Sequence, residues 1–508
     1  MGEVTYTDFP FKTHPYKHQH DCWRLSRDLP QYALFMDMGC GKSKTIIDTA
    51  AYLFLANKID AQVIVAPKGC YNNWVDAEMP AHMSDAVKWE AARWTSYQRK
   101  ADKEAMARLY LPGRYLRTFV FNVEAASSER GLEELAAFLQ KYRCMMTVDE
   151  STTIKSPTAK RTVAMINLGK LAHYRRICSG NPTPNSPLDV FSQSEFLKKN
   201  LMGYSNFFAF RNRFAVLKKQ KFGKGRAFQT VVGYRDLTLL KELMSRFSFI
   251  IKKADCLDLP PKIYQTIDCE MGPKQKEAYN QMRDACLVDL GAQGRVFATI
   301  VITQLVKLHQ IACGYMKTEA GHEIAFDEPN DRLAQLLDIL DGATGKVIIW
   351  AIYRYNIRQI SAAIAEKFGQ GSVVTFFGEN SGEERTDAKA RFQGLPARKD
   401  PRTGEMLPEV HHDPGTRFMV ANQAAGKFGN TWTRGTTMVY YANDYNLENR
   451  DQSEDRPHRI GQTESVLIID VRVRGTVDEK IVRALRVKKK LTDELVVSNW
   501  HWLVGDRV

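Results

Sequence analysis

The chain has 508 residues, 44% of them apolar, and carries a formal net charge of +14. A chain of this size has enough apolar side chains for two or three domains, and its nine cysteines, without a Cys-x-x-Cys pair, argue against a disulfide framework or a zinc ribbon. No apolar stretch approaches the roughly 20 residues that span a bilayer, so we expect a protein of a reducing, soluble compartment with no membrane partner.

The first 187 residues alternate short apolar runs with longer amphipathic segments. This rhythm is typical of a parallel sheet whose strands are joined by crossover helices. Residues 1–187 are therefore predicted to form a first α/β lobe. We expect its helices at 42–55 and 131–141, and its strands at 33–36, 62–66, 117–121, 144–148 and 175–178.

A glycine turn follows the first of these strands and reads Gly39-Cys40-Gly41-Lys42-Ser43. Backbone N–H groups of such a turn and the N-terminus of the next helix would cradle phosphates. Lys42 would meet the β and γ oxygens, and Ser43 would hold Mg²⁺. Met36 stands where the full phosphate-loop pattern has its first glycine, which leaves the two later glycines to form the turn.

Two acidic residues, Asp149 and Glu150, come directly after the apolar run 144–148. An aspartate at the end of a strand can orient Mg²⁺ and its waters, and the adjacent glutamate can position or activate an attacking water. The alternative is a solvated acidic loop. Ligands normally bind at the C-terminal ends of parallel strands, which favours catalysis.

Residues 188–262 depart from this rhythm and are predicted to form a basic, aromatic-rich helical insertion and linker that ends at Pro260 and Pro261. Between 196 and 235 there is no Asp or Glu, whereas ten Lys and Arg side chains are interleaved with aromatic ones. The cations suit the phosphates of a nucleic acid. Alternatively, the aromatic side chains form a core and the cations its solvated face. The candidate phosphate contacts are Lys218, Lys219 and Lys221.

The alternating rhythm returns after a helical segment at 263–330. Residues 331–508 are predicted to form a second α/β lobe with strands at 347–350, 373–376, 417–420, 438–441 and 466–471. Residues 394–415 are rich in Pro, Gly and charge and are predicted to form a loop or an exposed hairpin. A basic helix is expected at 478–490, where a Lys-Lys-Lys run is either part of the packed helix or a nuclear signal.

Residues 452–462 read Gln-Ser-Glu-Asp-Arg-Pro-His-Arg-Ile-Gly-Gln and place Arg456 and Arg459 three apart. A helix or tight turn at this spacing would aim both guanidinium groups in the same direction. Arginine suits a phosphate because its planar fork holds two oxygens and stabilises the charge that develops during phosphoryl transfer. The alternative role for both is a structural salt bridge.

Motifs across nearly the whole chain resemble those of superfamily 2 helicases, and in particular of the Swi/Snf-like DNA-dependent ATPases. Residues 36–43 resemble the first motif of that family, in which the leading glycine is also usually missing. The resemblance implies two RecA-like parallel-sheet lobes in tandem, with helical insertions. It also implies that Gln19, in the sequence Tyr-Lys-His-Gln, reads adenine.

The same resemblance implies contacts with nucleic acid in the first lobe. Residues 63–74 resemble the segment that touches the nucleic-acid backbone, which puts Lys68 near a phosphate. Residues 179–182, with Ser179 and Gly180, resemble the Thr-Gly-Thr-Pro element that couples hydrolysis to DNA. The third position of this element is Asn181 here, which puts the strength of that coupling contact in question.

In the second lobe, Gly378 and Arg385 resemble a further segment that touches the backbone. Residues 423–430, beginning at Gln423, resemble motif V, although Phe428 and Thr431 depart from its usual glycine and leucine. Residues 452–462 are similar to motif VI almost residue for residue. The resemblance therefore implies that the two arginines of 452–462 are arginine fingers for the γ-phosphate, with Gln452 nearby.

Together these motifs predict an ATP- and Mg²⁺-dependent motor that translocates on double-stranded DNA. A strand-separating helicase, with 394–415 as its wedge, and a nucleotide-gated DNA clamp with little turnover are the alternatives. Single-stranded DNA or RNA is the alternative track, and replication, recombination or nuclease proteins are the expected partners. The short chain resembles a compact bacterial or phage-encoded member, expected in the cytoplasm with the nucleoid.

Overall fold

The computed structural model describes residues 9–95, 97, 99–220, 228–289, 297–318, 320–395, 398–399, 406–426 and 431–496. The chain divides into two compact units. Unit 1 consists of Met1–Leu217, Val231–Asp258 and Lys490–Val508, and unit 2 consists of Lys218–Thr230 and Leu259–Lys489. Each unit contains its own sheet, and each is described separately.

The sheet of unit 1 has seven strands in the order β3-β4-β2-β5-β6-β1-β9, and every neighbouring pair is parallel. All five strands predicted for this lobe are present, within two residues of their expected bounds. The sheet also extends beyond residue 187, because β9 pairs with β1. The strands are β1 (Gln31–Met36), β2 (Ala61–Ala66), β3 (Trp89–Arg93), β4 (Leu116–Asn122), β5 (Cys144–Val148), β6 (Tyr174–Ser179) and β9 (Ser248–Ile251).

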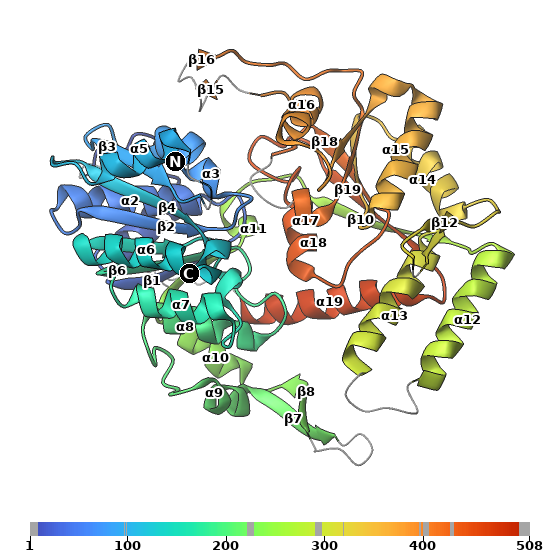
Figure 1. The fold of residues 1–508 in the computed structure, drawn as a ribbon, viewed down its shortest axis with the longest axis horizontal. Helices are drawn as coiled ribbons and strands as arrows, with labels where there is room; N and C mark the ends of the chain where they lie inside the picture. The colour runs from blue at the N-terminus through green and yellow to red at the C-terminus, as the bar shows by residue number, and fades with distance from the viewer. Residues whose placement is uncertain are drawn as a thin grey trace. The chain divides into compact units, whose positions relative to one another are not determined.

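Both faces of this sheet are buried under helices (Figure 1). Side chains alternate along a strand, so Phe35 of β1 joins one core and Leu34 joins the other. One core is completed by α6 (Glu129–Lys141), α7 (Lys160–Gly169) and α8 (Val190–Leu197), and the other by α1 (Lys17–Ser26) and α2 (Lys42–Leu55). The near-continuous apolar runs of the central strands follow from this burial on both faces.

The sequence predicted a helical insertion at 188–262, but the structure shows that this stretch also contains strands. It contains α9 (Phe207–Phe214), a two-stranded hairpin of β7 (Ala215–Gln220) and β8 (Phe228–Tyr234), and α10 (Leu237–Ser245). Phe210 and Phe214 are fully buried, so the alternative that the aromatic side chains form a core is right for them. Phe208 is 67% exposed, with the guanidinium carbon of Arg211 4.9 Å from its ring centre. The hairpin arises where β-branched and aromatic residues interrupt the helix-forming ones.

The sheet of unit 2 has six parallel strands in the order β10-β19-β18-β13-β17-β14. The five predicted strands are present, and β10 adds an edge strand that the sequence did not indicate. The strands are β10 (Lys262–Cys269), β13 (Lys346–Trp350), β14 (Val373–Phe376), β17 (Phe418–Ala421), β18 (Gly435–Tyr440) and β19 (Val466–Val473).

Helices also pack on both faces of the second sheet (Figure 1). Val347 and Ile349 of β13 join a core with α14 (Asp331–Gly342) and α15 (Arg354–Phe368). Ile348 and Trp350 face α16 (Gly382–Gln393) on the other side. Further helices of this part of the chain are α12 (Pro273–Asp289), α13 (Phe297–Ala312), α17 (Gln423–Gly426), α18 (Leu447–Glu454) and α19 (Val477–Leu495).

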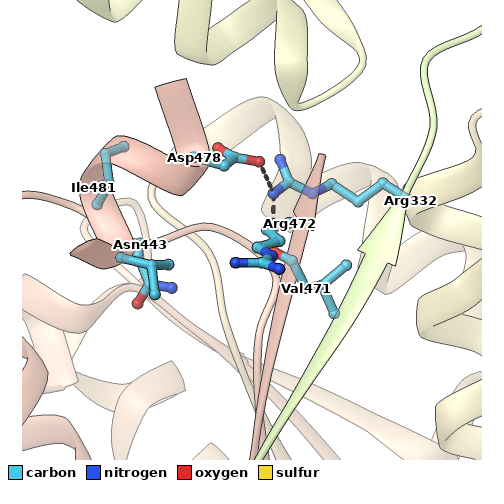
Figure 2. Close-up of a pocket in the computed structure, with 7 residues that line it drawn as sticks. Arg332, Asn443, Val471, Arg472, Asp478 and Ile481 are labelled. Carbon is cyan, nitrogen blue, oxygen red and sulfur yellow. Dashed lines mark hydrogen bonds and ion pairs between the residues drawn. The ribbon is translucent and has the colours of Figure 1, made fainter. Parts of the chain in front are cut away.

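A buried ion pair fixes the first turn of α19 within unit 2. Asp478 accepts a hydrogen bond from Arg332 at 2.5 Å and lies 3.2 Å from His309. Figure 2 shows Arg332 and Asp478 facing each other in a small pocket, and Arg332 also donates to the carbonyl oxygen of Val471. Burial opposes the charge of Asp478, but the two cationic neighbours outweigh it and lower the pKa of Asp478 to about 2.

The predicted fold class is confirmed: the chain is α/β, with two parallel sheets in tandem. Residues 394–415 contain a short antiparallel pair, β15 (Arg398–Lys399) with β16 (Met406–Leu407), as expected for a hairpin. Among the described residues, no helix is long and apolar enough to cross a membrane.

Candidate functional site

The glycine turn after β1 has the backbone conformation of a phosphate loop. Gly39 and Gly41 have φ values of +84° and +85°, a region that glycine enters without a steric penalty. α2 begins immediately afterwards at Lys42. The turn therefore presents the N-terminus of a fourteen-residue helix at the C-terminal end of a parallel strand.

Lys42 is folded against this turn. Its Nζ donates to the carbonyl oxygens of Met36 at 2.8 Å and Asp37 at 3.3 Å. Ser43 follows it in the first turn of α2 and is half-buried. The ammonium group thus lies inside the loop, where it can exchange carbonyl oxygens for phosphate oxygens.

Gln19, the predicted adenine contact, packs on the same loop. Its Nε2 donates to the carbonyl oxygen of Cys40 at 3.2 Å, and its Oε1 accepts from the backbone N–H of Tyr16 at 3.1 Å. His18 also reaches the carbonyl oxygen of Cys40, with its Nε2 at 2.9 Å. A Cβ on Gly41 would lie only 2.2 Å from Gln19 Nε2, so this close approach requires a glycine.

Asp149 lies at the end of β5 and is held by two donors. Its Oδ2 accepts from Trp74 Nε1 and its Oδ1 accepts from the backbone N–H of Glu150, each at 3.0 Å. Burial raises the pKa of Asp149, whereas the Trp74 hydrogen bond and the charge of Lys42 act to lower it. The charge of Lys42 therefore acts on Asp149 within unit 1, and the catalytic roles of both residues stay predictions.

Glu150 has φ +48° and ψ +60°, a left-handed backbone that is uncommon for a residue with a side chain. The flanking backbone is tied down, because Asp149 N donates to the carbonyl oxygen of Val65 and Thr153 N donates to that of Glu150. Such conformations cost about 1–3 kcal/mol and persist where neighbouring contacts enforce them. The left-handed backbone at Glu150 ends the extended run of β5 and leads the chain into the turn at Ser151–Ile154.

The loop after β6 lies against the phosphate loop. A Cβ on Gly180 would be 3.3 Å from Met38 Cγ, which places the two backbones in close approach. Ser179 is buried, and its Oγ accepts from the backbone N–H of Asn181. Asn181 Oδ1 in turn accepts from Thr183 N at 3.2 Å. The asparagine that departs from the family element therefore helps to shape this loop.

In unit 2, the two predicted arginine fingers lie in a turn after α18, in different environments. Arg456 is only 2% exposed, and its Nε donates to the carbonyl oxygen of Gln452 at 3.0 Å. Arg459 is half-buried, and its Nη1 donates to Thr431 Oγ1 at 3.1 Å. Gln452 is itself 2% exposed. The chain thus places Arg459 closer to solvent than Arg456.

A buried ionic network supports this turn. Arg450 donates from Nε to Glu454 at 2.7 Å and from Nη1 to Asp470 at 2.5 Å. Lys262 and Tyr264 of β10 also bind Glu454, at 3.3 Å and 2.8 Å. Burial opposes the charge of Glu454, but the neighbouring Lys262 and Arg450 outweigh it and lower the pKa of Glu454 to about 2. The network attaches α18 to β10 and β19.

The predicted nucleic-acid contacts differ in exposure. Lys68, Lys218 and Lys219 are exposed, and Lys221 lies outside the described residues. The structure brings Gly378 and Arg385 together, because Arg385 Nη2 donates to the carbonyl oxygen of Gly378 at 3.3 Å.

Two of these candidates are buried. Ser179 is 1% exposed, as the loop after β6 requires. Gln423 is 2% exposed, and neither atom of its amide has a hydrogen-bond partner among the described residues. Of the motif V segment, residues 427–430 lie outside the described residues. The nucleic-acid roles of all these residues stay predictions.

Several site residues were not singled out from the sequence. Trp74 was recognised only as the end of the 63–74 segment, yet its indole N–H binds Asp149. His18 and the network around Arg450 carried no motif of their own. A buried indole usually finds a partner for its N–H, so a tryptophan in a segment next to the predicted site could have suggested this contact.

The chain is similar in sequence to a known protein family and to several characterised proteins. A family model described as "SNF2-related domain" matches residues 18–316, more than half of the chain. The TATA-binding protein-associated factor MOT1 of Saccharomyces cerevisiae is 25% identical over 385 residues, which cover 69% of this chain and 20% of that protein. The ATP-dependent helicase brm of Drosophila melanogaster is 22% identical over 492 residues, which cover 91% of this chain and 27% of that protein.

Among solved structures, the Sulfolobus solfataricus SWI2/SNF2 ATPase core in complex with dsDNA is similar at 20% identity, with a TM-score of 0.41. The alignment covers 98% of this chain and 96% of that chain. The chain spans between 20% and 27% of the length of the two curated relatives.

Proposed function

The chain belongs to the SNF2-related domain family, and from this premise we propose that it is an ATP-driven motor that translocates on double-stranded DNA. The observation that carries the proposal is the arrangement in unit 1 of the phosphate loop, Lys42 and the Asp149–Glu150 pair. These groups meet at the C-terminal edge of one parallel sheet, where nucleotides bind in such folds. Family membership supplies the nucleic-acid part of the proposal.

The residues at this edge fit ATP and Mg²⁺. Among the described residues, no group of three or more His, Cys, Asp or Glu side chains is placed to hold a metal ion. Mg²⁺ usually takes one or two protein oxygens and completes its shell with water and phosphate. Ser43 and Asp149 would provide those oxygens, and Lys42 would turn from the loop carbonyls to the β and γ phosphates. The metal would neutralise charge that develops on the phosphates.

Glu150 is the residue we assign to the attacking water. Its carboxylate would orient that water in line with the γ-phosphate and accept its proton. The left-handed backbone at Glu150 supports this role, because strain of this kind concentrates at active sites.

Arg456 and Arg459 are assigned to the same reaction as arginine fingers that act when the two units close. Each cycle of closing and opening would advance the protein along its track. The exposed Lys218 and Lys219 are proposed to hold phosphates of that track.

The deciding experiment measures ATP hydrolysis with blunt duplex DNA, single-stranded DNA and RNA side by side. Duplex DNA is expected to stimulate hydrolysis most, and Lys42→Ala is expected to abolish the stimulated rate. Equal rates with and without every nucleic acid would contradict a nucleic-acid motor.

Two further measurements separate the alternatives. Strong unwinding of a forked duplex would favour a strand-separating helicase over a translocase. In single-turnover conditions, release of phosphate much slower than nucleotide exchange would instead favour a nucleotide-gated clamp.

A further inference from the structure

Gln193 lies on α8 and links two loops of the candidate site in unit 1. It is fully buried, and its side chain makes three hydrogen bonds. Its Oε1 accepts from Ser151 Oγ at 2.6 Å. Its Nε2 donates to the carbonyl oxygens of Pro182 at 2.7 Å and Asp189 at 2.8 Å.

The partners fix the orientation of this amide. Both carbonyl oxygens can only accept, so they must face the NH₂ group. The amide oxygen then faces the hydroxyl of Ser151, which donates. No other uncharged side chain of similar size offers one acceptor and two donors in this geometry except asparagine, which is one methylene shorter.

The two loops that Gln193 joins carry different parts of the proposed reaction. Ser151 directly follows Glu150, whose backbone is strained. Pro182 closes the segment that begins at Ser179, and Gly180 of that segment packs on Met38 of the phosphate loop. A shift of the 179–182 loop would therefore be transmitted through one buried side chain to the residue beside Glu150.

We propose that Gln193 is a positioning residue that transmits a displacement of the 179–182 loop to Glu150, and so couples nucleic-acid binding to water activation. This inference rests on the proposed function and adds to it the internal route by which DNA accelerates hydrolysis. Gln193 does not contact the reacting atoms. When the 179–182 loop is displaced, the bond to Ser151 brings Glu150 to the angle that the water needs, and small errors in such angles lower the rate strongly.

The test compares Gln193→Leu with a matched control on the same helix, Ser194→Ala. Ser194 is also buried, but its Oγ donates only within α8, to the carbonyl oxygen of Phe191 at 2.7 Å. For each full-length protein, kcat and KM for ATP are measured with and without duplex DNA, alongside the thermal unfolding midpoint.

Gln193→Leu is expected to lower the DNA-stimulated kcat by about 10- to 100-fold. The KM for ATP should stay close to that of the wild type, because the phosphate loop is untouched. The DNA-free rate should also change little, because the link through Gln193 acts only when the 179–182 loop is displaced. Ser194→Ala should retain full stimulation. A residue that only supported the fold would instead move the unfolding midpoint and both rates together.

A second variant keeps the test decisive if Gln193→Leu does not fold. Ser151→Ala removes one oxygen and breaks the same link, so it should show the same selective loss of stimulation. Because both changes interrupt one route, the double variant should be no worse than the more severe single one.

Full DNA stimulation in either folded variant would overturn the role of Gln193 while leaving the proposed function intact. Absence of stimulation in the wild-type protein would overturn both. The wild-type arm therefore distinguishes the two failures.

Discussion

Gly39 and Gly41 share almost the same backbone conformation but differ in what surrounds them. Both have positive φ, so either substitution by alanine strains the chain. A Cβ on Gly39 would meet no atom within 4 Å, whereas one on Gly41 would collide with Gln19. Gly39 is required by the backbone alone, and Gly41 by both the backbone and the packing of Gln19.

Gly39→Ala is expected to lower the free energy of unfolding by about 1–2 kcal/mol, the cost of a left-handed residue with a side chain. Gly41→Ala should lose more stability and weaken nucleotide binding, because Gln19 must move. Chemical denaturation and ATP titration measure the two effects. The Gln19→Ala, Gly41→Ala double variant should recover part of the stability lost in Gly41→Ala, and strictly additive losses would contradict the steric explanation.

Trp74→Phe removes the indole donor from Asp149 and keeps most of the packing. The hydrogen bond from Trp74 lowers the pKa of Asp149 against the raising effect of burial, so its loss should raise that pKa further. A protonated Asp149 binds a cation poorly, and the acidic limb of the ATPase pH profile should move to higher pH.

Trp94→Phe is the matched control for that profile. Trp94 is also buried in unit 1, and its Nε1 has no hydrogen-bond partner among the described residues. An identical shift in both variants would show that the Trp74 hydrogen bond is not the cause.

At the scale of elements, the segment after α18 is positioned by charge as well as by apolar packing. Glu454 is 5% exposed, and its carboxylate accepts hydrogen bonds from Arg450, Lys262 and Tyr264. A buried ion pair of this kind contributes little over an apolar substitute, but removing one partner is strongly destabilising. The stability of the segment that carries the arginine turn should therefore depend on pH.

The pKa of Glu454 is lowered from its ordinary value of 4.5, which applies to the unfolded chain, to about 2 in the folded protein. Its contribution to stability is therefore present above pH 4.5 and is lost as the pH falls toward 2, by about 3 kcal/mol in total. Glu454→Gln should flatten this part of the stability profile of unit 2, measured by denaturation between these pH values. Glu464→Gln, which removes an exposed carboxylate of the same unit, should leave the profile unchanged.

Within the two large sheets, the strands that the sequence did not indicate lie at the edges. β3 and β9 form the two edges of the first sheet, and β10 forms an edge of the second. β3 and β10 are only partly buried, so their residues lack the continuous apolar run of a central strand. β9 is buried but only four residues long, too short to separate from the linker beside it.

At the scale of the whole molecule, the proposed cycle requires Arg459 of unit 2 to act on phosphate held by unit 1. Arg459→Ala should therefore leave ATP binding to unit 1 nearly unchanged and lower the stimulated hydrolysis rate by about 10³-fold or more. Nucleotide titration and phosphate release measure the two quantities. Arg434→Ala, which removes an exposed cation from the same unit, is the control for a general loss of charge. Equal loss of binding and hydrolysis would contradict the finger assignment.

Local sequence patterns sufficed to predict the two parallel sheets and to propose a nucleotide site. Central strands buried on both faces must be apolar throughout, and a phosphate loop needs glycine, lysine and a hydroxyl in consecutive positions, so both leave a local pattern. Only the tertiary structure showed that Trp74 binds Asp149, that Gln193 joins the loops at Ser151 and Pro182, and that Glu454 gathers its cationic partners. These contacts join residues that are separated along the chain. Which donor pairs with which acceptor is decided only when folding brings them within hydrogen-bond distance.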